Sequence, residues 1–253
     1  MNLDQRTVVI LGPVKATMQN VVMTLTTMGA DVAIVDANAD QMQRFCQTVT
    51  DQREVNEKHG RAMTVKVDFN QVSSVKDGLS KVAQSFGSID VLIDSMSSSM
   101  PTPFAVSGKE EELDPIIHQN LTVSLKATQY VSGFLKSRKR GRIIYLLQDA
   151  FNRGNMEDAM ASAARTGLLA FSKALSRQLQ EFNVTVNCLS LGLTEEYLMG
   201  HFPDSKSIKE AHEKMKAMDP VMRISDPEKI ANAIVYLAGP SGAAITGQNL
   251  ILS

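Results

Sequence analysis

Few residues of this 253-residue chain combine the type and the spacing that chemistry requires. Its two cysteines, Cys46 and Cys188, lie in segments that otherwise look like core, so we expect no disulfide framework and no metal cluster. The four histidines lack ligand spacing, and the sequence therefore predicts no metal site; they are His59, His118, His201 and His212. The remaining candidates are Gly12, Asp36 and Asp68, which lie at or just beyond the ends of short apolar segments.

Two of these candidates point to phosphate and ribose chemistry. A glycine between a strand and a helix lets backbone N–H groups approach a phosphate, and Gly12 has this place. Lys15 follows it and either offsets phosphate charge or is a solvated loop lysine. Asp36 ends the second apolar segment, where it would accept hydrogen bonds from an adenine ribose, which favours NAD over NADP. The alternative for Asp36 is a strand-end residue that caps or begins a turn.

The elements that must position these residues alternate along the chain. Short β-branched runs predict strands, and longer segments with helical periodicity lie between them. This alternation favours right-handed crossovers and a parallel sheet. We therefore predict one α/β domain over residues 1–253, with a Rossmann-like, doubly wound, seven-stranded parallel sheet and helices on both faces. Ligands on such sheets bind beyond the carboxyl ends of the strands. The predicted strands are 6–11, 31–36, 62–68, 90–95, 142–147, 184–190 and 248–253, and the main predicted helices are 20–29, 39–58, 72–86, 110–137, 156–181, 205–218 and 227–238.

Composition excludes several classes of protein. The net charge of −1 gives no reason to expect nucleic acid or acidic lipid as a partner. The basic run at residues 136–140 is interpreted as a helix end, where cations complement the helix dipole. No signal peptide and no apolar run long enough to span a bilayer is apparent, so we expect a cytoplasmic protein without a membrane partner.

Six stretches together resemble the short-chain dehydrogenase/reductase family, and their pattern is most similar to that of the 3-oxoacyl-[acyl-carrier-protein] reductases. The resemblance covers nearly the whole chain. It implies the Rossmann fold, an NAD(P)-dependent oxidoreductase ancestry and assembly into dimers or tetramers. The stretches are FGSIDVLI, IIHQNLTVSLKATQYV, GRIIYLL, RTGLLAFSKALSRQL, VTVNCLSLG and PEKIANAIVYLA…ITGQNL.

The catalytic motif departs from that family. Alignment on residues 167–169 (Gly-Leu-Leu) of the predicted helix 156–181 places the family's Tyr at Ala161, its Lys at Arg165 and its Ser at Gln148, while its Asn is kept as Asn120. Ala161 has no proton to give, and positioned acid–base catalysis contributes about 10²- to 10⁴-fold. The Ser is implied to donate to a developing oxyanion, a contribution of roughly 10²-fold or more. Gln148 could still donate from its amide.

The cofactor loop departs as well. The family pattern Thr-Gly-x-x-x-Gly-x-Gly is here LGPVKATM, which keeps one glycine, Gly12. Pro13 removes a backbone donor, and Met18 puts a long side chain where close approach is needed. Asp68 stands where the family has an aspartate that contacts adenine, or it is a strand-end residue in a turn. The family's Asn-Asn-Ala-Gly becomes residues 94–97, DSMS. We predict no bound cofactor, or NAD(H) if one binds.

Three functional hypotheses remain. The first is a pseudoenzyme that acts as a structural or regulatory subunit. It would form a homo-oligomer (a dimer or tetramer) or a hetero-oligomer with an active relative, packing through helices 110–137 and 156–181. The second is an active NAD(P)(H)-dependent oxidoreductase with a non-standard proton donor. Its candidates near the cleft are Tyr145, Asp149, Tyr197 and His201.

The third hypothesis is a binding module. In it Asn120, Gln148 and Arg165 line the cleft and hold a nucleotide or an acyl ligand, because an amide and a guanidinium suit a carboxylate or phosphate. The alternative for Arg165 is an ion pair with Glu157 or Asp158. Whether Met18, Met96 and Leu191 fill the cleft is left open at this point.

Overall fold

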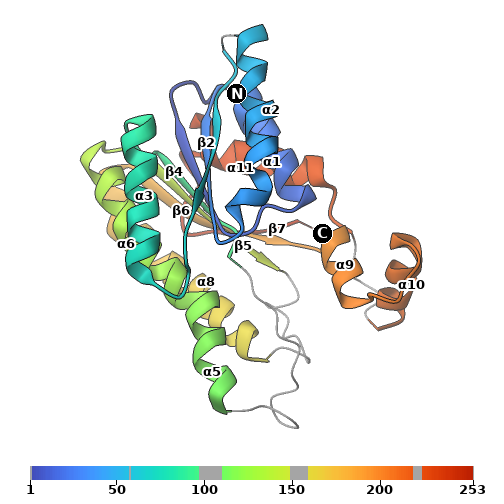
Figure 1. The fold of residues 1–253 in the computed structure, drawn as a ribbon. Coiled ribbons are helices and arrows are strands. Elements are labelled where there is room, and N and C mark those ends of the chain that lie inside the picture. Colours follow the sequence, from blue (N-terminus) through green and yellow to red (C-terminus); the bar gives the residue numbers. More distant parts are fainter. Residues whose placement is uncertain (1, 57, 97–109, 149–158, 219–223, 253) are drawn as a thin grey trace.

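One parallel sheet of seven strands organises the chain. The computed structural model describes residues 2–56, 58–96, 110–148, 159–218 and 224–252 (Figure 1). The strand order is β3-β2-β1-β4-β5-β6-β7, and every pairing is parallel. The predicted seven-stranded, doubly wound sheet is therefore confirmed. The strands are β1 (Thr7–Leu11), β2 (Asp31–Asp36), β3 (Ala62–Lys66), β4 (Val91–Asp94), β5 (Gly141–Gln148), β6 (Val184–Leu191) and β7 (Asn249–Leu252).

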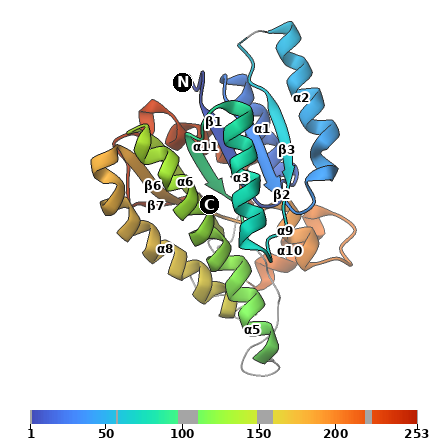
Figure 2. The ribbon, with the colours of Figure 1, turned by 60° about the vertical axis from the view of Figure 1, so that its left-hand side comes forward.

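Helices cover both faces of this sheet, as the views in Figures 1 and 2 show. On β1, Val9 and Leu11 join the core beneath α3, α6 and α8, whereas Val8 and Ile10 join the core beneath α1, α2 and α11. Side chains alternate between faces along a strand, so a strand buried on both sides is largely apolar. The helices are α1 (Ala16–Thr27), α2 (Gln43–Val55), α3 (Val72–Phe86), α6 (Val123–Ser137), α8 (Ala159–Leu179) and α11 (Pro227–Ala238).

The predicted helix 110–137 is continuous but not uniform. It consists of α5 (Glu110–Ile117), a π-helical turn (His118–Thr122) and α6. The π turn carries Asn120, the residue that aligns with an active-site position of the family. Such turns insert one residue into a helix and redirect the side chains on it.

A helix that the sequence analysis missed lies beyond the carboxyl end of β6. This helix, α9 (Glu195–His201), packs against α10 (Ile208–Met218), and the two stand apart from the main layers in Figure 1. They share a small core of their own, formed around Leu193 and Leu198. The signal for α9 was present, because Thr194 is a helix-capping residue type and its Oγ1 accepts from the backbone N of Tyr197 at 3.2 Å.

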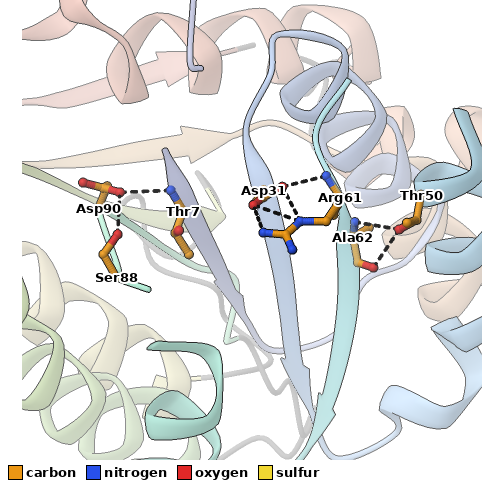
Figure 3. A network of polar contacts seen from close by, with 7 residues as sticks. All are labelled: Thr7, Asp31, Thr50, Arg61, Ala62, Ser88 and Asp90. Carbon is orange, nitrogen blue, oxygen red and sulfur yellow. Dashed lines mark hydrogen bonds and ion pairs between the residues drawn. The ribbon is translucent and has the colours of Figure 1, made fainter. Parts of the chain in front are cut away.

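The buried carboxylate of Asp90 makes contacts at the amino ends of the strands. Asp90 accepts hydrogen bonds from Thr7 N (3.0 Å) and Ser88 Oγ (3.1 Å), as Figure 3 shows. Arg138 and Arg140 each approach its other oxygen to 3.3 Å. The basic run therefore follows the end of α6, as predicted, and two of its cations neutralise Asp90.

Candidate functional site

A cleft with a volume of about 510 Å³ lies at the carboxyl edge of the sheet. It extends from the start of α1, past the ends of β4, β5 and β6, to α9. This is the edge at which the topology places ligands in doubly wound folds. Met18 and Leu191 are in its wall, so they narrow the cleft without closing it, whereas Met96 is buried against Gly12. Its polar lining includes Lys15, Gln148, Tyr197 and His201.

The position that aligns with the family's proton donor holds only a methyl group. Ala161 has 0% of its surface exposed and lies in a small apolar cluster with Ile116, against which Met160 packs. It is not part of the cleft lining. The methyl group of Ala161 therefore packs against apolar side chains of the domain and does not line the cleft.

The guanidinium of Arg165 is directed into the domain. Arg165 is 1% exposed; its Nη2 donates to the backbone oxygen of Leu146 and its Nη1 to the backbone oxygen of Asn120 at 3.4 Å. Burial lowers its pKa, and the negative charge of Asp94 opposes that shift. The expectation that Arg165 lines the cleft is therefore wrong, because its longer, planar group reaches backbone acceptors behind the cleft wall.

Asp94, at the end of β4, supplies the opposite charge. Its Oδ1 accepts from Met96 N at 2.9 Å, and its Oδ2 is buried with no hydrogen-bond partner among the residues that the structure describes. Burial raises the pKa of this carboxyl, and the positive charge of Arg165 opposes the increase. The charge of each group thus favours the ionised form of the other, against the effect of burial. The alternative partners Glu157 and Asp158 lie outside the described residues.

Asn120 is also absent from the cleft. It is fully buried, and its Nδ2 donates to the backbone oxygen of Ile116 at 3.0 Å. Of the three polar groups expected to hold a ligand, Asn120, Gln148 and Arg165, only Gln148 lines the cleft. Its Oε1 has no hydrogen-bond partner in the described part of the chain.

The four candidates for a replacement proton donor lie in different environments. Tyr145 lies inside β5 with 0% exposure, and its hydroxyl is 2.7 Å from Thr128 Oγ1. Burial raises its pKa well above the ordinary value, so its expected place near the cleft was wrong. Tyr197 and His201 do line the cleft, and their rings stack with centroids 5.7 Å apart. Asp149 lies outside the described residues.

Gly12 is required by the packing of the chain itself. Its φ is +107°, a backbone conformation that residues with a Cβ rarely adopt. Its backbone N donates to Val35 O at 2.9 Å. A Cβ at this position would lie 3.0 Å from Met96 N. The close approach of β1 to the end of β4 thus explains this glycine whether or not a phosphate binds there.

The two aspartates assigned to the adenosine half have different environments. Asp36 is buried at the end of β2. Asp68 is exposed; its carboxylate accepts from Asn70 N at 2.9 Å and from Gln71 Nε2 at 3.0 Å, which organises the turn before α3. A role for either residue toward a dinucleotide stays a prediction.

The sequence analysis missed a contact between the two ends of the cleft. Glu196 on α9 accepts from Thr17 N at 2.7 Å and from Thr17 Oγ1 at 2.9 and 3.0 Å. Burial raises the pKa of Glu196, but these hydrogen bonds outweigh burial and hold it below its usual value. Two acidic residues after Thr194 indicated a helix start, but nothing in the sequence indicated that one of them reaches α1.

Rossmann-type folds use the first turn after β1 to hold the pyrophosphate of a dinucleotide. The residues here do not fit that group. The Thr17 N–H is taken by Glu196, Pro13 has no N–H, and the Met18 side chain stands in the first turn of α1.

Two other kinds of site are not found in the described part of the chain. No group of three or more His, Cys, Asp or Glu residues there is arranged to hold a metal ion. Among the helices that the structure describes, none has the length and apolar character needed to cross a membrane.

Comparison with known proteins agrees with the Rossmann-like fold. The family profile described as enoyl-(acyl carrier protein) reductase matches residues 19–253. The chain belongs to the short-chain dehydrogenase/reductase family. The resemblance seen in the sequence is thereby confirmed, including its closeness to the 3-oxoacyl-[acyl-carrier-protein] reductases.

Three relatives illustrate this membership of the short-chain dehydrogenase/reductase family. The 3-oxoacyl-[acyl-carrier-protein] reductase of Vibrio cholerae is 26% identical over 250 residues, which are 99% of this chain and 96% of that protein. A (2S)-[(R)-hydroxy(phenyl)methyl]succinyl-CoA dehydrogenase subunit of Thauera aromatica is 25% identical over 251 residues, covering 99% and 96% of the two chains. The acetoacetyl-CoA reductase of Shinella zoogloeoides is 28% identical over 185 residues, covering 73% and 75%.

Proposed function

We propose that this chain is a catalytically inactive member of the short-chain dehydrogenase/reductase family that acts as a structural or regulatory subunit. The observation that carries the proposal is the direction of Arg165, whose guanidinium is 1% exposed and donates to backbone oxygens inside the domain. The cation that aligns with the family's catalytic Lys therefore serves the core. Ala161 beside Ile116 supports the same conclusion, because that position has neither a hydroxyl nor access to the cleft.

The surface of α8 supports a role in assembly. Small residues are exposed along one side of this helix at Ala163, Thr166 and Ala170, and the half-buried Leu169 and Phe171 lie next to them. Small side chains let two helices approach closely, and flanking apolar groups supply area for burial. The relative from Thauera aromatica is itself named a dehydrogenase subunit. We propose a homo-oligomer or a hetero-oligomer with an active relative, located in the cytoplasm.

One observation favours a second candidate function, an NAD(P)(H)-dependent oxidoreductase with a non-standard proton donor. Tyr197 and His201 both line the cleft, and each is a residue type that transfers protons. This candidate needs a dinucleotide to bind beside them, and the start of α1 does not fit one.

A turnover assay separates the two candidates. The purified full-length chain is given acetoacetyl-CoA with NADH and, separately, with NADPH, and oxidation of the nicotinamide is followed. We expect no turnover above a protein-free blank. Turnover that is lost in Tyr197→Phe or His201→Ala would reject the pseudoenzyme and support the second candidate. Repeating the assay with an active relative of this protein added would test the hetero-oligomer.

A further inference from the structure

Glu196 on α9 contacts Thr17 on α1, although the two residues are 179 positions apart in the chain. Both of its carboxylate oxygens are used: Oε1 accepts from the backbone N and the hydroxyl of Thr17, and Oε2 accepts from the same hydroxyl. Thr17 is buried in the first turn of α1, and Glu196 is half-buried on α9. Since α9 is anchored by the fully buried Leu198, the carboxylate is presented from a packed element.

The start of α1 has few other negative groups to complement it. Its N-cap residue is Lys15, which makes no side-chain cap, and the first turn contains no acidic residue. A 12-residue helix has unsatisfied N–H groups and a partial positive charge at this end. Glu196 therefore supplies the capping acceptor and the negative charge that the local sequence lacks.

We propose that Glu196 is an internal substitute for a phosphate group, which latches α9 onto α1 and keeps dinucleotides out of the cleft. This inference rests on the proposed function and deepens it, because it names the residue that excludes the family's cofactor. A phosphate and a carboxylate compete for the same Thr17 N–H, and a second anion beside Glu196 would meet like charge. Met18 narrows the cleft at the start of α1, and the carboxylate of Glu196 occupies the position beside Thr17 N that a phosphate would take.

The test compares nucleotide binding by three variants with wild type. Glu196→Ala removes the charge and the bulk, and Glu196→Gln removes the charge alone. Glu195→Ala is the matched control, because Glu195 is the exposed neighbour on the same helix and its substitution changes the net charge equally. Each full-length protein is titrated calorimetrically with NADH and with ADP-ribose after its fold is checked by circular dichroism.

We expect Glu196→Ala to bind NADH and ADP-ribose at least about 10-fold more tightly than wild type, since hydrogen bonds to a charged group contribute roughly one to two powers of ten. Glu196→Gln should show a smaller gain, and Glu195→Ala none. If the folded Glu196 variants gain no affinity, the latch is not what excludes the nucleotide and the inference is wrong. Equal, tight binding by wild type would also overturn it.

Failure of the latch and failure of the proposed function give different results. Turnover of acetoacetyl-CoA by wild type would count against the proposed function, whatever the Glu196 variants bind. Nucleotide binding by Glu196→Ala without turnover would support both, because the latch would be open and the proton donor still missing. Turnover by Glu196→Ala, with none by wild type, would support the latch and show that the remaining cleft residues are competent.

Discussion

The guanidinium of Arg165 donates to the backbone oxygen of Leu146, which ties α8 to β5 near the carboxyl end of that strand. This places a positive charge behind the wall of the cleft instead of within it. Asp94, buried at the end of the adjacent strand β4, opposes the lowering of the Arg165 pKa by burial. The side chain of Arg165 is thus part of the domain interior.

Arg165→Met is expected to lower the free energy of unfolding by about 1–3 kcal/mol, because it removes the buried hydrogen bonds to the backbone oxygens of Leu146 and Asn120 and the positive charge that favours the ionised form of Asp94. Chemical denaturation measures the effect. Arg177→Met, an exposed site on the same helix, should change stability by about 0.5 kcal/mol or less. The double variant Arg165→Met, Asp94→Asn should cost less than Arg165→Met alone. A small effect of Arg165→Met would argue against a stabilising charge pair.

Ala161→Tyr, which reinstates the family's residue, is expected to destabilise the fold by about 1–3 kcal/mol, because the position is filled by Ile116 and its neighbours. It should bring no turnover of acetoacetyl-CoA. Thermal unfolding and the reductase assay are the two measurements. Ala163→Tyr on the exposed side of α8 serves as the control for adding a phenol. Activity in Ala161→Tyr at unchanged stability would mean that the cleft can still accept the family's donor.

Tyr145→Phe is expected to cost about 1–3 kcal/mol of stability, because it leaves the buried hydroxyl of Thr128 without its 2.7 Å partner. It should leave ligand binding unchanged. Tyr130→Phe removes a hydrogen bond of the same length to the less buried Ser80 and should cost less. Denaturation curves of the two variants decide the order. If Tyr145→Phe alone lost ligand binding, Tyr145 would have to be counted among the ligand-binding residues.

The contact of Glu196 should depend on pH in a defined direction. Its folded-state pKa lies below the ordinary value of 4.5, so the ionised form is stabilised by folding. The stability that it contributes is fully present above about pH 4.5 and is lost as the pH falls through the folded-state pKa. The stability difference between wild type and Glu196→Gln should therefore shrink below pH 4.5. A difference that grows on acidification would contradict this assignment.

Ala170→Arg is expected to reduce the molar mass in solution, because a long cation on the exposed side of α8 would prevent close packing with a partner helix. Light scattering after gel filtration measures the mass. Thr48→Arg, an exposed position on α2, should leave the mass unchanged. A wild type that is monomeric at high concentration, alone and with an active relative, would remove the basis for this surface as an interface.

Much of the fold was predictable because burial on both faces of a parallel sheet requires apolar strands with helical segments between them. Val8 to Leu11 form an apolar run and lie in a strand, and Val184 to Leu191 form a largely apolar run that is also a strand. The missed helix α9 is a seven-residue element whose stability comes from contact with α10 rather than from its own periodicity. Periodicity over so short a segment is a weak signal.

The sequence by itself determined the family, the sheet and the absence of a hydroxyl at Ala161, because these follow from residue types and local periodicity. Only the tertiary structure decided where the charges are directed. Arg165 could face the cleft or the interior from the same helix position, and Asp94 and Leu146 on neighbouring strands draw it inward. Likewise Glu196 meets Thr17 only because α9 and α1 converge at one edge of the sheet. Such pairings join residues distant in the chain, so no local pattern records them.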